Sequence, residues 1–271
     1  MNRKILWPLI AVLVVGLIAI FYPRRAPEPP VPLELPEPAS DAAPDASELV
    51  DPPPEPEPGF VTEGPAGPEP LPTLDESDEE AQAALKEATS EELVNEHLVT
   101  DSIVRKIVTT VDNLPLDTIW MKSRAVPQID GRFRVEGSGE ETYLSKENYA
   151  RYSPFVQLIE NIDTATLADQ YERHYPLLQE AYQELGYPGR QFHNRAIEVI
   201  DHLLATPDVQ GRVRLVQPHV FYKFADPRLE SLSAGQKTLI RIGPENAAII
   251  RSKLIELRAE LERRSEAPDD E

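Results

Sequence analysis

The stretch "SLSAGQKTLIRIGPENAAIIRSKLIELRAEL" at residues 231–261 carries the signals of two successive helices. Ser233 and Gln236 have the S-x-x-Q spacing of a capping box, in which each side chain bonds the backbone N–H of the other residue. Gly243 is expected to end the first helix, and Pro244 to begin the second. Apolar residues then recur at Ala247, Ile250, Leu254, Leu257 and Leu261. This spacing predicts a helix that packs one face against a core, with a partner-binding seam as the alternative.

Residues 232–236 of this stretch differ by one methyl group from the signature loop of the ABC-type ATPases. That loop acts on a nucleotide held by a phosphate cradle of the form GxxxxGK[ST]. Of all the glycines, only Gly59 and Gly64 have this spacing, and Pro65 follows them in place of lysine. The sequence therefore argues against a nucleotide-hydrolysing enzyme and favours a capped core helix.

Composition divides the chain into three zones: a membrane anchor at 1–25, a proline-rich acidic disordered linker at 26–74, and a mainly helical globular domain at 75–271. Residues 26–96 hold 20 acidic residues against one lysine, so they carry nearly all of the net charge of -20. Such a segment repels nucleic acid, and no nucleic-acid partner is expected. The chain has no cysteine, which excludes disulfides and thiolate metal sites. No cofactor is expected.

The segment from Ile5 to Tyr22 contains no charged residue. At about 1.5 Å per residue, such a helix nearly spans a hydrocarbon core of ~30 Å. Trp7 and Tyr22 lie at its ends, where aromatic rings prefer the headgroup layer. A cleaved signal peptide is the competing interpretation, but the small residues that precede a cleavage site are missing. The sequence therefore predicts an uncleaved, single-pass anchor in the inner membrane.

Basic residues flank both ends of this segment. The amino terminus, Arg3 and Lys4 slightly outweigh Arg24 and Arg25, which favours a cytoplasmic N-terminus. The globular domain is then expected in the periplasm of a Gram-negative cell. The opposite orientation, with a cytosol-facing domain, stays open as an alternative.

Residues 23–72 contain 17 of the 28 prolines. Proline fixes φ and lacks a backbone donor, so this stretch favours extended polyproline II. At ~3.1 Å per residue it could reach roughly 150 Å. The pattern predicts a spacer between membrane and domain, with a solubilising segment as the alternative.

Helix boundaries in the globular part follow from capping residues and prolines. Asp101 is a candidate N-cap and Pro115 a stop for one helix. Asp163 or Thr164 is expected to begin a second helix, which is expected to bend or restart at Pro176. The sequence thus predicts a multi-helix domain.

Two arginine-bearing segments, "GRFRVEG" at 131–137 and "GRVRLVQ" at 211–217, alternate as strands do. The first segment and the "ETYLS" segment from Glu141 predict a short β-hairpin. If the two arginine-bearing strands pair, four guanidinium groups share one face, a geometry suited to phosphate or carboxylate. The candidate site for an anionic ligand therefore consists of Arg132, Arg134, Arg212 and Arg214. The competing interpretation is that these arginines occupy the solvated face of two amphipathic strands.

Glu198 and His202 are spaced one helical turn apart, with Asp201 beside them. A metal site usually needs a third protein ligand, and no HExxH spacing is present, so no metal site and no catalytic group are predicted. His202 is expected to be a surface histidine in a salt bridge. If the chain were an enzyme acting on an envelope polymer, Glu180 or Glu198 would be the candidate acid.

Several phrases in order, among them "VDNLP" from Val111, "YARYSPFV" from Tyr149, "YPLLQEAYQELGYP" from Tyr175 and the 232–247 stretch, give the chain a resemblance to a known family. It resembles the proteobacterial proteins of unknown function called DUF3014, over about residues 70–262. The resemblance implies a single-pass anchor, a proline-rich spacer and a mainly helical C-terminal domain. It implies no activity, ligand or catalytic residue.

These observations predict a non-enzymatic envelope protein, anchored in the inner membrane through Ile5 to Tyr22. Its mainly α periplasmic domain, with a short β-hairpin element, would bind or scaffold an envelope protein or an anionic envelope component. An envelope-polymer enzyme and a cytosol-facing anchored adaptor are the alternatives.

Overall fold

A computed structural model describes residues 71–88, 101–118, 132–161 and 163–265 of the chain. The expected anchor from Ile5 to Tyr22 and nearly all of the expected linker lie outside these residues. Across the described part, no helix has the length and apolar character needed to cross a bilayer.

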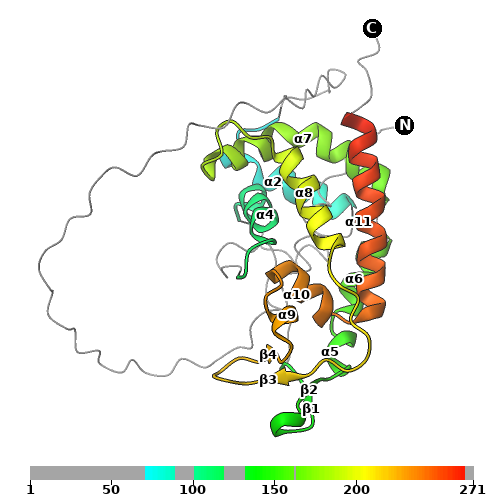
Figure 1. Cartoon of the computed structure of the whole chain (residues 1–271). Helices are drawn as coiled ribbons and strands as arrows, with labels where there is room; N and C mark the ends of the chain where they lie inside the picture. The colour runs from blue at the N-terminus through cyan, green and yellow to red at the C-terminus, as the bar shows by residue number, and fades with distance from the viewer. Residues whose placement is uncertain (1–70, 89–100, 119–131, 162, 266–271) are drawn as a thin grey trace, which may run out of the picture.

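Helices make up most of the described chain, as the sequence predicts (Figure 1). They are η1 (Leu74–Glu76), α2 (Asp78–Ala88), α4 (Ile103–Asn113), α5 (Glu147–Ala150), α6 (Ser153–Glu160), α7 (Thr164–Glu184), α8 (Phe192–Leu204), α9 (Pro227–Glu230), α10 (Ala234–Arg241) and α11 (Pro244–Ser265). Helix α11 packs against α6, α7, α8 and α10, while α4 packs against α2, α7 and α8.

Two short hairpins lie at the end of the helical body that is far from the C-terminal end of α11 (Figure 1). The first pairs β1 (Val135–Glu136) with β2 (Tyr143–Leu144), with η3 (Gly139–Glu141) between them, and the second pairs β3 (Leu215–Val216) with β4 (Lys223–Phe224). An antiparallel bridge joins Tyr143 of β2 to Arg214, just before β3. The bridge therefore places the two hairpins side by side in the spatial order β1-β2-β3-β4, although four helices separate β2 from β3 along the chain.

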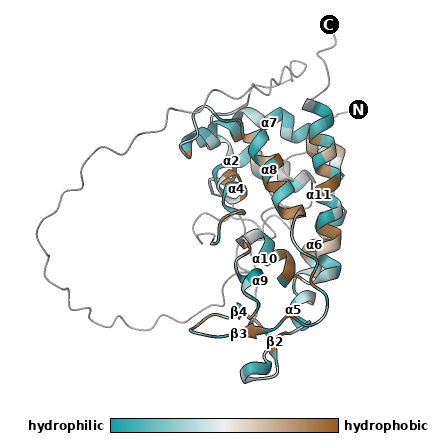
Figure 2. Ribbon diagram, viewed as in Figure 1, coloured by the Kyte–Doolittle hydropathy of each residue, from teal (hydrophilic) through white to brown (hydrophobic). Residues whose placement is uncertain are grey.

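The core follows the helical periodicity of the sequence. The apolar residues that recur along α11 are buried, and so is one apolar face of α8. Figure 2 shows hydrophobic and hydrophilic residues alternating along α11. The buried positions on these two helices include Phe192, Ala196, Val199, Leu203, Ala247, Ile250, Leu254, Leu257 and Leu261. A second, smaller apolar cluster lies under the hairpins and contains Leu144, Val213, Leu215, Phe224 and Ile240. Because Ile240 belongs to α10, this helix contributes to both parts of the molecule.

Helix α7 begins at Thr164, with Asp163 as its N-cap, within the two starting positions that the sequence allows. The Asp163 carboxylate accepts a hydrogen bond of 2.8 Å from the Thr166 backbone N–H. The helix does not restart at Pro176, since it runs without interruption from Thr164 to Glu184. Tertiary packing on both sides of the proline keeps the helix running where the local sequence favours a break.

The start of α4 is capped by a residue from another helix, and the Asp101 prediction is wrong. The N-cap position is Ser102, whose φ of 51° is left-handed and whose side chain makes no capping bond. The Asp78 carboxylate instead accepts from the backbone N–H groups of Ser102 (2.7 Å) and Ile103 (2.8 Å). Asp78 is the first residue of α2, so this cap exists only once α2 packs on α4. Pro115 follows the end of α4, as expected.

Candidate functional site

The predicted capping box at the start of α10 is present. Ser233 Oγ accepts from the Gln236 N–H at 3.2 Å, and Gln236 Oε1 accepts from the Ser233 N–H at 3.3 Å. The next amides are also used: Ala234 N–H donates to Leu116 O (2.7 Å) and Gly235 N–H to Leu114 O (3.0 Å). Since protein acceptors take all the amides of this first turn, it does not offer the donors that a phosphate would need.

Gly235 allows α10 to lie close to its neighbours. A Cβ atom added at this position would come within 2.7 Å of Leu203 Cδ2 on α8 and 3.1 Å of Leu114 O. The glycine that gives the stretch its ATPase-like appearance is therefore explained by helix packing.

His202 on α8 contacts the α10 cap. Its Nε2 lies 2.8 Å from Ser233 Oγ, and burial followed by the nearby Arg195 charge lowers the pKa of His202, which favours the neutral ring. The expected salt-bridged surface histidine is thus wrong: the ring is half-buried, and Asp201 beside it pairs with Arg258. A serine and a histidine in contact resemble a nucleophile and its base. Here the serine oxygen is buried and committed to the helix cap, so the contact is structural.

Two buried cations of α10 face the hairpin end. Lys237 Nζ donates to Glu230 O at 3.2 Å, and burial lowers the pKa of Lys237. The Arg241 guanidinium carbon lies 5.0 Å from the centroid of the Phe224 ring in β4. Sequence reasoning missed both roles, because a lysine and an arginine inside a helix pattern normally indicate its solvated face. The "AGQKTLIR" stretch therefore supports the inner side of the hairpins.

The β3-β4 hairpin has two distinct sides. Successive residues of a strand point to opposite faces. Val213, Leu215 and Phe224 are buried against the body, and Tyr222 packs partly against the same cluster. The alternate residues form what we call the outer face: Arg212, Arg214, Val216, Phe221 and Lys223, all exposed.

The four predicted arginines do not form a single cluster. The two arginine-bearing segments do not pair with each other, because β2 lies between them. The guanidinium carbon of Arg212 lies over the ring of Tyr143 in β2, 3.8 Å from its centroid, and Arg212 Nη2 is 3.5 Å from Glu136 Oε2. Arg134 Nε lies 3.2 Å from Glu147 Oε2.

Arg132 and Arg214 are exposed. Sequence reasoning missed the contacts that Tyr143 and the two glutamates make with the arginines, although it predicted a hairpin that contains Tyr143. The signal that could have found them is the position of the "ETYLS" segment between the two arginine-bearing segments along the chain. Binding of an anion by the arginines stays a prediction.

Comparison with known proteins gives one result. Residues 103–258 match the model of a family described as "Protein of unknown function (DUF3014)". The chain belongs to this family. No curated protein and no solved structure gives a significant match to it. In this DUF3014 chain, the matched segment runs from the first residue of α4 into α11, and it contains both hairpins and α10.

The candidate acids of the DUF3014 chain lie on different helices. Glu198 on α8 pairs with Arg195 at 3.2 Å, and Glu180 is exposed on α7. Within the described residues there is no group of three or more histidine, aspartate or glutamate side chains that could hold a metal ion.

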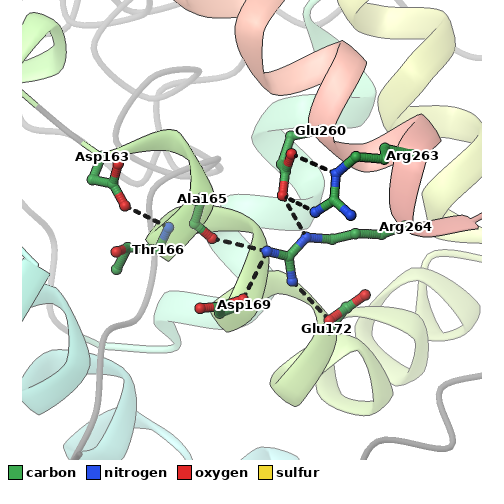
Figure 3. A network of polar contacts seen from close by, with 8 residues as sticks. All are labelled: Asp163, Ala165, Thr166, Asp169, Glu172, Glu260, Arg263 and Arg264. Carbon is green, nitrogen blue, oxygen red and sulfur yellow. Dashed lines mark hydrogen bonds and ion pairs between the residues drawn. The ribbon is translucent and has the colours of Figure 1, made fainter. Parts of the chain in front are cut away.

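A network of ion pairs joins the end of α11 to the start of α7 (Figure 3). Arg264, with only 12% of its side chain exposed, contacts Asp169 (2.7 Å), Glu172 (2.9 Å) and Glu260 (2.9 Å). It also donates to Ala165 O at 3.2 Å. With three carboxylates and a carbonyl, this guanidinium has its donors directed inward, and the network acts as a clamp between helices.

Proposed function

We propose that this DUF3014 protein is a membrane-anchored, non-enzymatic binding module whose outer hairpin face captures an anionic component of the bacterial envelope. The observation that carries the proposal is the side-by-side placement of Arg212 and Arg214 on an exposed strand face held from behind by α10. Guanidinium groups recognise phosphate and carboxylate through directed donors.

The location is proposed from the sequence. An uncharged segment from Ile5 to Tyr22 followed by a proline-rich acidic stretch fits an inner-membrane anchor and a spacer, with the domain in the periplasm. The proposed spacer lets the hairpin end reach a ligand that lies away from the bilayer. It also lets the hairpin end fold back to a ligand at the bilayer surface.

The contacts of the candidate catalytic side chains support binding rather than catalysis. Ser233 and His202, the pair nearest to a nucleophile and base, are committed to helix capping. The carboxylates of Asp201 and Glu198 are each held by an arginine. The outer face, by contrast, presents cations to solvent.

Retention of the full-length chain on heparin, in neutral detergent, tests the proposal with a defined polyanion. The variant R212E/R214E is expected to bind at least about tenfold more weakly, since each basic group near an anionic surface contributes roughly fivefold. The matched control is R190E/R263E, which makes the same change in net charge on exposed arginines outside the hairpins.

The control pair should leave retention closer to that of the wild type. Equal losses in the two variants would show that only overall charge matters and would overturn the proposed site. Incubation of the chain with purified peptidoglycan should release no fragments, and release would favour the enzyme alternative.

A further inference from the structure

The β3-β4 hairpin combines exposed apolar side chains with its cations. Val216, Val220 and Phe221 are exposed to 42%, 48% and 44%. They lie within six residues of one another, and they include half of the large exposed hydrophobic residues of the described chain. Figure 1 shows the connection between β3 and β4 extending away from the helices. The apolar groups are therefore presented on a protruding tip.

The charges on this hairpin have one sign. From 209 to 225 the chain contains Arg212, Arg214 and Lys223 and no acidic residue, although the protein as a whole has a net charge of -20. The cross-strand register places Lys223 opposite Val216, so cation and apolar group are direct neighbours. Phe221 follows on the same side by the alternation of the strand.

The backbone keeps this arrangement in place. Tyr222 turns inward, where its ring lies 5.8 Å from that of Phe133, so its neighbour Phe221 turns outward. Gln217 Nε2 donates to Val220 O at 3.1 Å across the tip. The outward direction of Phe221 therefore follows from the inward packing of Tyr222.

We infer that the β3-β4 hairpin docks on an anionic lipid bilayer, with Val220 and Phe221 entering the headgroup layer and the outer-face cations contacting lipid phosphates. This inference rests on the proposed function and names its anionic component. Apolar insertion combined with attraction of basic groups is how peripheral segments bind anionic membranes.

The shape of the surface favours a bilayer over a folded protein partner. A stable protein interface buries about 800 Å² on each side and has a closely packed apolar centre. A few apolar side chains on a protruding tip, with three cations on the strands behind them, offer too small a centre for that. A bilayer can accept them because it adapts to the shape of the tip.

The absence of cysteine allows a site-specific test on the full-length chain. V220C is labelled with an environment-sensitive nitrobenzoxadiazole dye and reconstituted into vesicles of phosphatidylcholine, with or without phosphatidylglycerol. The expected result is a blue-shifted emission that lipid-borne quenchers suppress, only with phosphatidylglycerol. The matched control is I255C on α11, an apolar position outside the hairpins that is exposed to 57%, which should show no shift.

Replacing the three outer-face cations measures their contribution to lipid contact. R212Q/R214Q/K223Q in the V220C background should lower the equilibrium constant for lipid contact roughly 100-fold, about fivefold for each basic group. Added salt should weaken contact in the wild-type background. Circular dichroism of each variant checks that the helices are retained.

The outcomes separate this inference from the proposed function. An unshifted dye on phosphatidylglycerol vesicles, with heparin retention still dependent on Arg212 and Arg214, would overturn lipid docking and leave a soluble anionic partner. Equal shifts on both vesicle types would overturn the role of lipid charge. Loss of both the dye shift and the heparin dependence would overturn both proposals.

Discussion

Arginines have different surroundings in the helical body and on the hairpins. In the body, Arg264 contacts three carboxylates and is 12% exposed, and Arg195 contacts the nearly buried Asp112. On the hairpins, Arg212 has one carboxylate, at 3.5 Å, and its side chain is 58% exposed. The same residue type thus holds helices together in one region and stays accessible in the other.

The difference teaches how to separate structural from functional charge in this protein. An arginine whose donors are consumed by neighbouring carboxylates contributes to stability and has little left for a ligand. An exposed pair contributes little to stability, because solvent screens it. Substitution of a body arginine should therefore lower stability, whereas substitution of an outer-face arginine should leave stability nearly unchanged and weaken ligand binding.

Substitution of Arg195 by methionine should give the largest loss of stability. Arg195 Nε lies 2.8 Å from Asp112 Oδ1, and its Nη2 donates to Asp112 O at 2.9 Å. Removing it leaves the nearly buried Asp112 carboxylate without its cation, with the neutral Tyr187 hydroxyl 3.3 Å away. The free energy of unfolding should fall by about 3 kcal/mol, measured by urea denaturation of the full chain in detergent. Arg214→Met on the outer face is the control and should stay within about 0.5 kcal/mol. Equal losses of unfolding free energy in the two variants would contradict the distinction between body arginines and outer-face arginines.

Acid should destabilise the body through His193. Burial lowers the pKa of this histidine from 6.5 to about 4. The unfolded chain then binds a proton that the folded chain excludes, so stability is lost as the pH falls from 6.5 toward 4. Between pH 8 and pH 5 this group should lower the unfolding free energy by about 2 kcal/mol.

The His193→Leu variant should remove that portion of the pH dependence. His219→Gln on the exposed hairpin serves as the control and should keep the wild-type profile. Parallel profiles for the wild type and His193→Leu would contradict the prediction.

Substitution of Ser233 by alanine sharpens the comparison at the helix that joins the two regions. It removes the cap of α10 and the partner of His202, and should cost about 1 kcal/mol of stability. Ser231→Ala, two residues earlier and exposed, is the matched control and should have a smaller effect. Thermal unfolding followed by circular dichroism measures both. A larger loss for Ser231→Ala would show that the capping box does not stabilise α10.

The smallest effect is expected for the stacked pair on the hairpins. The Arg212 guanidinium lies 3.8 Å from the Tyr143 ring centroid at an exposed site, where such a pair contributes about 0.5 kcal/mol. A double-mutant cycle with Arg212→Met and Tyr143→Leu should give a coupling energy of that size. A coupling above about 2 kcal/mol would mean that Arg212 is as structural as the body arginines.

Much of the helical body was predictable from local signals. The capping box of α10 and the apolar spacing of α11 need only neighbouring residues, and the structure confirms both. The start of α7 was predicted to within one residue, and the Asp163 carboxylate caps it. The Asp78 cap of α4 was not predictable, because the two residues that it bonds lie 24 and 25 positions along the chain. The candidate site was half predictable. The alternation of residues predicted the exposed arginines, but the placement of β2 between the two arginine-bearing segments depends on strand pairing across the fold.

The sequence by itself determined that the domain is mainly helical, where α10 begins and which face α11 buries, because periodicity and capping act over a few residues. Only the tertiary structure decided the use of each charge. Whether an arginine is consumed by carboxylates, stacked on a ring or left exposed depends on residues that meet across the fold. The inserted strand β2 shows this most clearly, since it separates two arginine segments that the sequence pattern alone would have paired.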